Sequence, residues 1–275
     1  MMQSEEIEIR SLHLIEELEE VRELESKIWG GDDSVPTHQT ITAVKNGGLV
    51  LGAYINQELI GFQYSFPGFN GTSVYLCSHI LATDEQFRNK KIGEKLKLAQ
   101  REEARKLGYS LITWTYDPLQ SVNGYLNIAK LGGVCSTYIE NCYGEMDDLL
   151  NNGMPSDRFL VEWHINSEGG ATSSTHEVEL DVLLEKSVIQ WEVNEEGLPI
   201  PSRTNVLQSE QQETAYVPIP KAFQAIKEAD SEAALKWRMV TRDIFLGMFQ
   251  KGWKVTGFHK NSVQGIPVNF YVLTK

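Results

Sequence analysis

A strand, a basic turn and an amphipathic helix follow one another directly between residues 75 and 107, and this succession restricts the fold more than any other part of the 275-residue chain. A period of two predicts a strand with one face carrying Tyr75, Cys77, His79, Leu81 and Thr83. Apolar residues then recur at helical spacing, at Ile92, Leu96, Ala99 and Leu107. The turn between the two periodic segments therefore leads into a helix N-terminus.

This turn, residues 88–93, is here called the basic turn. It carries Arg88, Lys90 and Lys91, although the chain as a whole has a formal net charge of −13. The first amide groups of a helix lack intrahelical partners, and with the helix dipole they attract anions, each interaction being worth about 0.3–1 kcal/mol when exposed. The pattern predicts a site for a phosphate-bearing ligand. The alternative is a solvated basic turn before a surface helix.

The basic turn reads Arg88-Asn89-Lys90-Lys91-Ile92-Gly93. It resembles the Arg/Gln-x-x-Gly-x-Gly/Ala pattern of the Gcn5-related N-acetyltransferases, the GNAT superfamily. Lys91 replaces the first glycine of that pattern, which puts one close backbone approach to a pyrophosphate in question but adds a cation. The resemblance implies that acetyl-CoA or another acyl-CoA contacts this segment through Arg88, Asn89, Lys90, Lys91, Ile92, Gly93, Glu94 and Lys95.

The elements after the turn have the order typical of that family. Gly108 is a predicted helix end, residues 109–116 form a predicted strand, and residues 121–131 a second helix closed by two glycines. In the family, the pantetheine arm of coenzyme A lies between two splayed parallel strands. The resemblance implies that this arm hydrogen-bonds to the backbone of Leu81, Ala82 and Thr83. Asn123 and Asn127 lie near where the family uses an asparagine on the pantetheine or its thiol; simple solvent exposure is the alternative.

Acyl transfer to an amine needs a base for the amine and an acid for the departing thiolate. His79 is a candidate base, because the unperturbed pKa of imidazole is about 6.5 and some members of the family use a histidine at this strand position. A buried structural histidine is the alternative. The family commonly places the tyrosine that acts as general acid where this chain has Ile128. Tyr125, one turn earlier, is the nearest substitute, with packing as its alternative role, and Tyr138 or Tyr143 from the next strand are further candidates. We expect Cys77 to be a buried small residue rather than a nucleophile.

Composition excludes several classes of protein. The net charge is acidic, so the chain lacks the basic footprint of a nucleic-acid-binding protein, and we expect no binding to DNA or RNA. No apolar run approaches the about 20 residues that span a bilayer, and residues 1–10 are too polar for a secretory signal, so we expect a cytoplasmic protein without a membrane association. Three cysteines without metal-type spacing predict reduced thiols, with neither a disulfide nor a structural metal.

The sequence predicts an α/β (α+β) fold in two parts. Residues 1–166 form a GNAT-like acyl-CoA-binding domain with a mixed, mostly antiparallel sheet, splayed central parallel strands and flanking helices, and residues 167–275 form a smaller α+β unit of unknown role. In the first part we expect a helix from Ser11 and a hairpin turning at Asn56-Gln57. In the second we expect a linker at residues 167–175, strand-like pieces in 177–201, a helical region in 222–250 and two final strands. A degenerate acetyltransferase duplicate is an alternative for this part.

The function predicted from these patterns is that of an acyl-CoA-dependent N-acyltransferase, acetyl or succinyl, acting on a small amine or amino acid by direct transfer. Arg158, Arg238 and Arg242 would recognise a carboxylate if they face the site; ion pairing with nearby acids is the alternative. A non-catalytic acyl-CoA-binding module and a basic-turn interaction protein are the competing functions. The oligomeric state is open, including a homo-oligomer.

Overall fold

The computed structural model describes residues 6–30, 34–88, 90–144, 154–166, 178–204, 212–263 and 265–275. The chain falls into two compact units, Met1–Trp114 with Trp163–Glu168, and Thr115–Glu162 with Gly169–Lys275. Each unit joins helices to mostly antiparallel strands, so the predicted α/β class is confirmed. This division by packing differs from the sequence division at residue 166, which stays a prediction.

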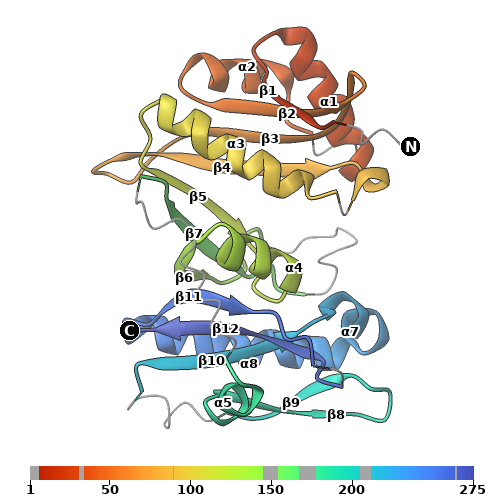
Figure 1. Ribbon diagram of the computed structural model, residues 1–275, viewed down its shortest axis with the longest axis vertical. Coiled ribbons are helices and arrows are strands. Elements are labelled where there is room, and N and C mark those ends of the chain that lie inside the picture. The colour runs from red at the N-terminus through yellow and green to blue at the C-terminus, as the bar shows by residue number, and fades with distance from the viewer. Residues whose placement is uncertain are drawn as a thin grey trace. The chain divides into compact units, whose positions relative to one another are not determined.

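The first unit is a sheet with helices on both faces (Figure 1). In chain order it contains β1 (Glu8–Ser11), α1 (Ile15–Trp29), α2 (Thr37–Lys45), β2 (Leu49–Ile55), β3 (Glu58–Phe69), β4 (Val74–Thr83), the 3₁₀ turn η2 (Glu85–Phe87), α3 (Ile92–Lys106) and the start of β5 (Leu111–Tyr116). Neighbouring strands follow the order β1-β2-β3-β4-β5, and all pairs are antiparallel except β4 with β5.

The two faces of this sheet have different chemistry. The face that α1 and α2 cover is apolar, with a cluster made of Leu12, Leu18, Val21, Leu24, Val50, Tyr54, Phe62, Tyr64 and Ala82. On the face that α3 covers, Leu96 and Ala104 are buried, but polar side chains are buried with them. Burial of the apolar stripe of each helix stabilises its packing, at roughly 25 cal/mol per Å² of apolar surface.

Two local predictions have different outcomes. The tight hairpin turn is confirmed, since Asn56 and Gln57 have φ values of 49° and 69°, which a two-residue type I′ turn requires. The predicted helix start at Ser11 is wrong. Ser11 pairs with Leu51 as the last residue of β1, and the helix begins at Ile15. The Glu17 carboxylate accepts hydrogen bonds from the free amides before the helix, which fixes the later start.

A β-bulge interrupts β4, and it corrects the predicted strand faces. Tyr64 pairs with Ile80 but the next residue, Ser65, pairs with Ser78, so His79 is the extra residue. The alternation of side chains therefore changes phase at this point. Tyr75 and Cys77 share a face with Ile80 and Ala82, toward α1, whereas Leu81 and Thr83 share a face with Leu76 and Ser78, toward α3. The prediction that His79, Leu81 and Thr83 share one face of the strand is therefore wrong.

The second unit is built around one long helix. It contains the end of β5, α4 (Ser121–Gly124), the π-helical segment η3 (Tyr125–Lys130), β6 (Val134–Ile139), most of β7 (Arg158–His164), α5 (Leu180–Glu185), β8 (Ile189–Val193), β9 (Pro199–Thr204), β10 (Thr214–Pro220), α7 (Phe223–Ala229), α8 (Ser231–Gln250), β11 (Lys254–His259) and β12 (Val268–Thr274). Its strands follow the order β7-β6-β11-β12-β10, with β8 and β9 as a separate hairpin. Phe159, Phe245 and Tyr271 are completely buried and meet edge to face in its core.

The predicted helical region is confirmed as two helices, which break at Asp230. The Asp230 carboxylate caps α8 by accepting from the Ala233 amide. Both final strands are also confirmed as β11 and β12. Between residues 177 and 201 the strand prediction holds for β8 and β9, but Leu180–Glu185 is helical. Pro218 and Pro220 lie within β10, which tolerates them because it is the last strand in the order. The predicted linker lies outside the described residues.

Candidate functional site

Asp84 fixes the path of the chain from β4 into the basic turn. One carboxylate oxygen accepts from the Gln86 amide at 3.0 Å, which caps η2, and the other accepts from Lys27 Nζ of α1 at 2.6 Å. The hydrogen bond from Lys27 is the main reason that the pKa of Asp84 lies below its usual value of 3.8. Asp84 is 3% exposed, so this short segment is held from both sides before the cations begin.

Lys91 has the backbone conformation that a glycine usually supplies. Its φ and ψ are 59° and 26°, in the left-handed region, and it stands directly before α3. For a residue with a Cβ this conformation costs roughly 1–2 kcal/mol. Lys91 therefore has the left-handed backbone that a glycine adopts freely. Its presence in place of glycine strains the backbone of the turn without changing the path of the chain.

The start of α3 has open amide groups. No side chain caps it, and the first turn consists of Ile92, Gly93 and Glu94, whose amides precede the first intrahelical bond, from Lys95 to Lys91. A Cβ added at Gly93 would meet Leu81 Cδ2 at 3.6 Å, an ordinary contact, so the protein's own packing does not require glycine there. Gly93 thus presents a bare backbone beside Leu81 of β4.

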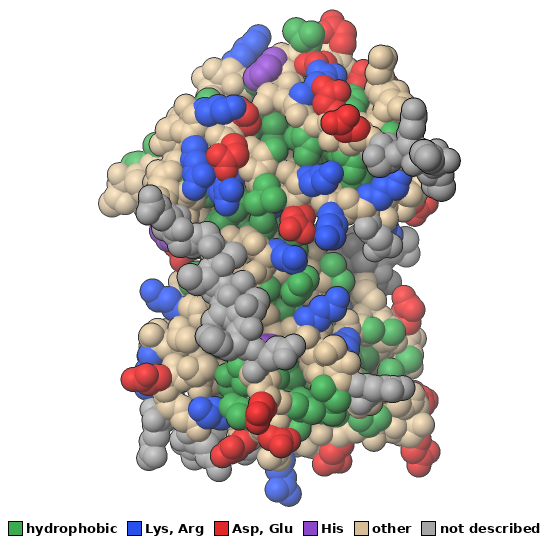
Figure 2. All heavy atoms as spheres, in the orientation of Figure 1, with side chains coloured by type: hydrophobic (Ala, Val, Ile, Leu, Met, Phe, Trp, Pro, Cys, Tyr) green, Lys and Arg blue, Asp and Glu red, His purple; other side chains and the backbone are tan. Residues whose placement is uncertain are grey.

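The cations of the basic turn are exposed around this helix start. Arg88, Lys90 and Lys91 have exposed side chains, and Lys90 Nζ lies 5.0 Å from the centroid of the Phe87 ring. Figure 2 shows lysine and arginine side chains on the face of the first unit that carries α3. Lys95 is also exposed and Glu94 is half-buried, while Asn89 lies outside the described residues. The described cations and the free amides together have the character of an anion site.

The parallel strands beside this site are paired over a short length. In the described part of the chain, β4 pairs with β5 at Leu76 with Ile112 and at Cys77 with Thr113. β4 continues for six residues beyond Cys77, with its opposite edge paired to β3 as far as Thr83. Leu81, Ala82 and Thr83 thus lie beyond the last pair, as a splayed strand would place them.

His79 lies at the bulge, where the pairing with β5 has already ended. Its ring lies beside Tyr64 and Phe66, with centroid distances of 6.0 and 5.5 Å, on the α1 face of the sheet. Part of the side chain is exposed, yet the surrounding protein removes enough solvent to hold the pKa of His79 below 6.5. Desolvation thus favours the neutral imidazole, which is the form that accepts a proton.

Lys97 is a prominent residue of this region that the sequence analysis missed. It is 2% exposed and belongs to α3, with its Nζ 2.8 Å from Ser78 Oγ, 3.2 Å from Gln100 Oε1 and 3.5 Å from the centroid of the Trp114 ring. Burial lowers the pKa of Lys97 well below 10.5. Its spacing from Gly93 and Ala104, four residues one way and seven the other, was the signal that it faces the sheet.

The remaining predicted site residues belong to the second unit. Tyr125 is half-buried and its ring meets Phe258 at a centroid distance of 6.5 Å. Asn123 is exposed, whereas Asn127 is 5% exposed and its carbonyl accepts from the Gly133 amide. These contacts describe packing within that unit, and the catalytic and cofactor roles of the three residues stay predictions.

The arginines that were candidates for a carboxylate ligand have partners inside the second unit. Arg242 makes two hydrogen bonds to the Asp157 carboxylate, at 2.8 and 2.7 Å. Arg238 lies 2.6 Å from Asp117, and Arg158 donates to the Asp157 carbonyl. Ion pairing, the alternative given above, accounts for Arg238 and Arg242.

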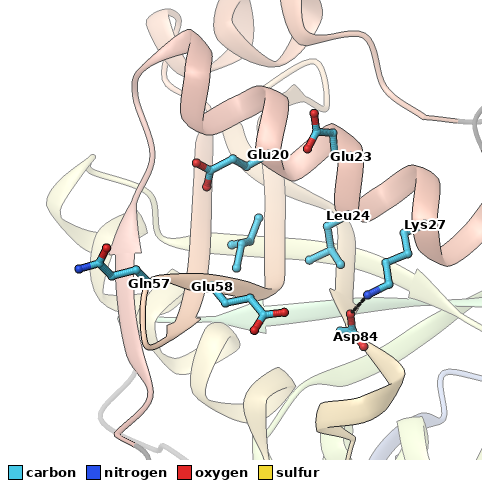
Figure 3. A pocket seen from close by; sticks show the side chains of 8 residues that line it. Glu20, Glu23, Leu24, Lys27, Gln57, Glu58 and Asp84 are labelled. Carbon is cyan, nitrogen blue, oxygen red and sulfur yellow. Dashed lines mark hydrogen bonds and ion pairs between the residues drawn. The ribbon is translucent and has the colours of Figure 1, made fainter.

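A surface pocket of about 290 Å³ lies on the α1 side of the first unit (Figure 3). It is lined by Glu20, Glu23, Leu24, Lys27, Gln57, Glu58, Leu59 and Asp84. With four carboxylates and one ammonium group it repels anions, so a phosphate-bearing ligand is expected at the basic turn and not here. Across the described ranges, no three His, Cys, Asp or Glu side chains gather as a metal site. None of the helices in those ranges is long and apolar enough to cross a membrane.

No protein-family model and no curated protein matches the chain. Among solved structures it is similar to a GNAT-family acetyltransferase from Streptococcus pneumoniae, with 15% identity and a TM-score of 0.48 over 57% of this chain and 98% of that one. It is also similar to the ribosomal-protein-S18-alanine N-acetyltransferase of Escherichia coli, at 15% identity, a TM-score of 0.48 and coverage of 60% and 97%. It is similar as well to a putative acetyltransferase from Salmonella typhimurium, solved with its cofactor acetyl-CoA. Here the identity is 15% and the TM-score 0.47, over 61% of this chain and 99% of that one.

Proposed function

We propose that this chain is an acyl-CoA-dependent N-acyltransferase of the GNAT superfamily. The observation that carries the proposal is the path of the chain from β4 to α3. A bulged strand leaves its parallel neighbour after Cys77, and its end leads through a left-handed residue, Lys91, into an uncapped helix surrounded by cations. Each part matches a need of coenzyme A, which has an amide-rich arm and a pyrophosphate.

In this proposal the pyrophosphate accepts hydrogen bonds from the first amides of α3, and Arg88, Lys90 and Lys91 balance its charge. The pantetheine arm lies along Leu81, Ala82 and Thr83 on the side of β4 that faces the splay. Because the arm starts at the helix and runs back along β4, its thiol end reaches the bulge. The acyl group would then lie close to His79.

His79 is the proposed base for the acceptor. The bound acyl-CoA supplies an activated acyl group, and a neutral imidazole takes the proton that the amine loses as its nitrogen attacks the thioester carbon. The low pKa of His79 favours this role at neutral pH. Direct transfer needs no nucleophile of the protein, which agrees with Cys77, whose pKa burial raises.

The acceptor is proposed to be a small amine or an amino acid, and the acyl group acetyl or succinyl. Since Arg238 and Arg242 are paired with Asp117 and Asp157, they offer little support for a donor or acceptor with an extra carboxylate. Acetyl-CoA is therefore the donor to test first, with succinyl-CoA as its comparison.

A non-catalytic acyl-CoA-binding module is the second candidate. It is favoured by Ile128, which is buried at 2% exposure where the family commonly has its acidic tyrosine. Under this alternative the basic turn would bind acyl-CoA, but no amine would release the thiol.

A thiol-release assay separates the two candidates. The full chain is incubated with acetyl-CoA or succinyl-CoA and a panel of amines and amino acids, and free CoA is measured for wild type, His79→Ala and Lys106→Ala. Lys106 is the control, because it lies at the opposite end of α3 and, in the described part of the chain, forms its ion pair with Glu103. Amine-dependent release that His79→Ala abolishes and Lys106→Ala preserves supports the enzyme. Binding of acyl-CoA without release from any amine supports the module.

A further inference from the structure

Lys97 is the one described lysine that is fully buried, and no described carboxylate forms an ion pair with it. Its amine contacts two polar atoms, Ser78 Oγ and Gln100 Oε1, and the face of Trp114. Burying an amine away from a counterion is costly, so a helix that only needed to pack would carry an apolar residue there. Leu96, next to it, shows that the same helix buries leucine without difficulty.

The position of this amine relative to the splay is specific. The last pair between β4 and β5 joins Cys77 to Thr113, and the next residues of the two strands are Ser78 and Trp114. Lys97 contacts both of these side chains. Its amine therefore lies beneath the point where the two strands separate, one residue from the bulge at His79.

Ser78 has its hydrogen-bond acceptors in use. Its Oγ accepts from Lys97 Nζ at 2.8 Å and from Gln63 Nε2 at 3.3 Å. A hydroxyl group has two acceptor positions and one proton. The proton of Ser78 is thus available to a further acceptor, and it makes no hydrogen bond to a described residue. Gln63 Oε1 and Trp114 Nε1 are likewise buried without a hydrogen-bond partner among the described residues.

We propose that Ser78 donates a proton to the departing thiolate of coenzyme A and that Lys97 replaces this proton from behind. The inference rests on the proposed function, because it needs the thioester at the bulge. It supplies the acid that the chain lacks at Ile128. Ser78 is the catalytic residue in this scheme. Lys97 is the positioning residue, which orients Ser78 and returns a proton to its Oγ.

The protons and electrons balance as follows. The acceptor nitrogen forms a bond to the thioester carbon, and the carbon–sulfur bond breaks with its electron pair on sulfur. The Ser78 proton moves to sulfur, and a proton from the Lys97 ammonium moves to Ser78 Oγ. The proton that His79 took from the amine is released to solvent, from which Lys97 is protonated again before the next turnover.

The groups that face Lys97 support a proton donor of moderate strength. Lys97 contacts Ser78 from β4, Gln100 from α3 and Trp114 from β5. From β3, Gln63 bonds to Ser78 and Ser65 bonds to Gln100. The Cys77 thiol, on the other face of β4, is the titratable group that acts electrostatically on Lys97, and burial raises the pKa of that thiol. Burial lowers the pKa of Lys97 well below 10.5, so its ammonium gives up a proton more readily than that of an exposed lysine.

The test is the pH dependence of kcat at saturating acetyl-CoA and amine, for wild type, Lys97→Met, Ser78→Ala and the surface control Lys106→Met. Calorimetry with acetyl-CoA is run on each. We expect unchanged affinity, a loss in kcat of about 10²–10⁴-fold for Lys97→Met and a decrease for Ser78→Ala. The wild-type kcat should fall at alkaline pH as Lys97 loses its proton, and this limb should be missing in Lys97→Met.

Wild-type kcat and an unchanged alkaline limb in Lys97→Met would overturn the inference while leaving the proposed function standing. If Lys97→Met does not fold, Ser78→Ala decides, since it removes only a hydroxyl group; a wild-type profile in that variant would overturn the inference. If wild type itself neither binds acetyl-CoA nor releases the thiol, the proposed function fails and the inference fails with it.

Discussion

The Lys27 ammonium lies 2.6 Å from the Asp84 carboxylate and joins the last turn of α1 to the segment that leads into the basic turn (Figure 3). The same carboxylate caps η2 through the Gln86 amide. Because one buried side chain makes both contacts, it couples the position of the basic turn to the packing of α1.

Asp84→Ala should lower the free energy of unfolding by about 1 kcal/mol, the typical cost of a lost cap. The pKa of Asp84 is depressed in the folded protein, so its charge stabilises the fold fully above the unfolded pKa of about 3.9, and this contribution is lost as pH falls through the lower folded pKa. Urea unfolding of wild type and Asp84→Ala, at neutral pH and at a pH below the folded pKa of Asp84, measures this contribution. An equal mutational effect at both pH values would contradict this role.

Lys91→Gly should stabilise the fold by about 0.5–1 kcal/mol, because glycine adopts the left-handed conformation without a Cβ penalty. The same change should weaken the binding of acyl-CoA, since it removes a cation. Lys91→Asn is the matched control, because asparagine tolerates this conformation but carries no charge. Thermal unfolding and calorimetry together separate strain from charge. Tighter binding in Lys91→Gly would show that the lysine charge plays no part.

His79→Gln should reduce kcat/KM by about 10²–10⁴-fold with little change in the affinity for acyl-CoA. In wild type, kcat/KM should fall as pH falls through the pKa of His79, which lies below 6.5, because the protonated ring no longer accepts a proton. His13→Gln is the control, since that side chain is exposed on another element. An acidic limb that persists in His79→Gln would assign the base to another group.

Asp117→Leu should destabilise the protein by about 3–5 kcal/mol, because it leaves the buried guanidinium of Arg238 without its ion-pair partner. Among the described residues, Nε and Nη1 of Arg238 already lack hydrogen-bond partners, and the Asp157 carboxylate, which also acts on Arg238, is held by Arg242. The double variant Asp117→Leu with Arg238→Met should be more stable than Asp117→Leu alone. A double-mutant cycle by urea unfolding checks this, and strictly additive effects would contradict it.

Local patterns in the sequence predicted much of the first unit. Helical spacing located α3, and the Asn56-Gln57 pair located the hairpin turn, because both depend on residues close together in the chain. The bulge could not be predicted in this way. An extra residue in β4 is defined by the register of its partner β3, and the change of phase at His79 follows from that partner.

The candidate site was predicted in part. Exposed cations before a helix indicated the basic turn directly, whereas the buried Lys97 was overlooked because lysine is almost never fully buried. In the second unit, Cys135 of β6 pairs with Val255 of β11, 120 residues later in the sequence. Pairing over such a distance depends on tertiary packing, so no local pattern revealed that residues 115–162 pack with the C-terminal part.

The most direct test of the central claim is a calorimetric comparison of CoA with pantetheine, which lacks the pyrophosphate, for wild type and for the triple variant Arg88→Ala, Lys90→Ala, Lys91→Ala. The account predicts that wild type binds CoA more tightly than pantetheine and that the triple variant loses this difference while still binding pantetheine. Equal affinities of wild type for the two ligands, or a triple variant with wild-type affinity for CoA, would contradict the assignment of the basic turn as the pyrophosphate site.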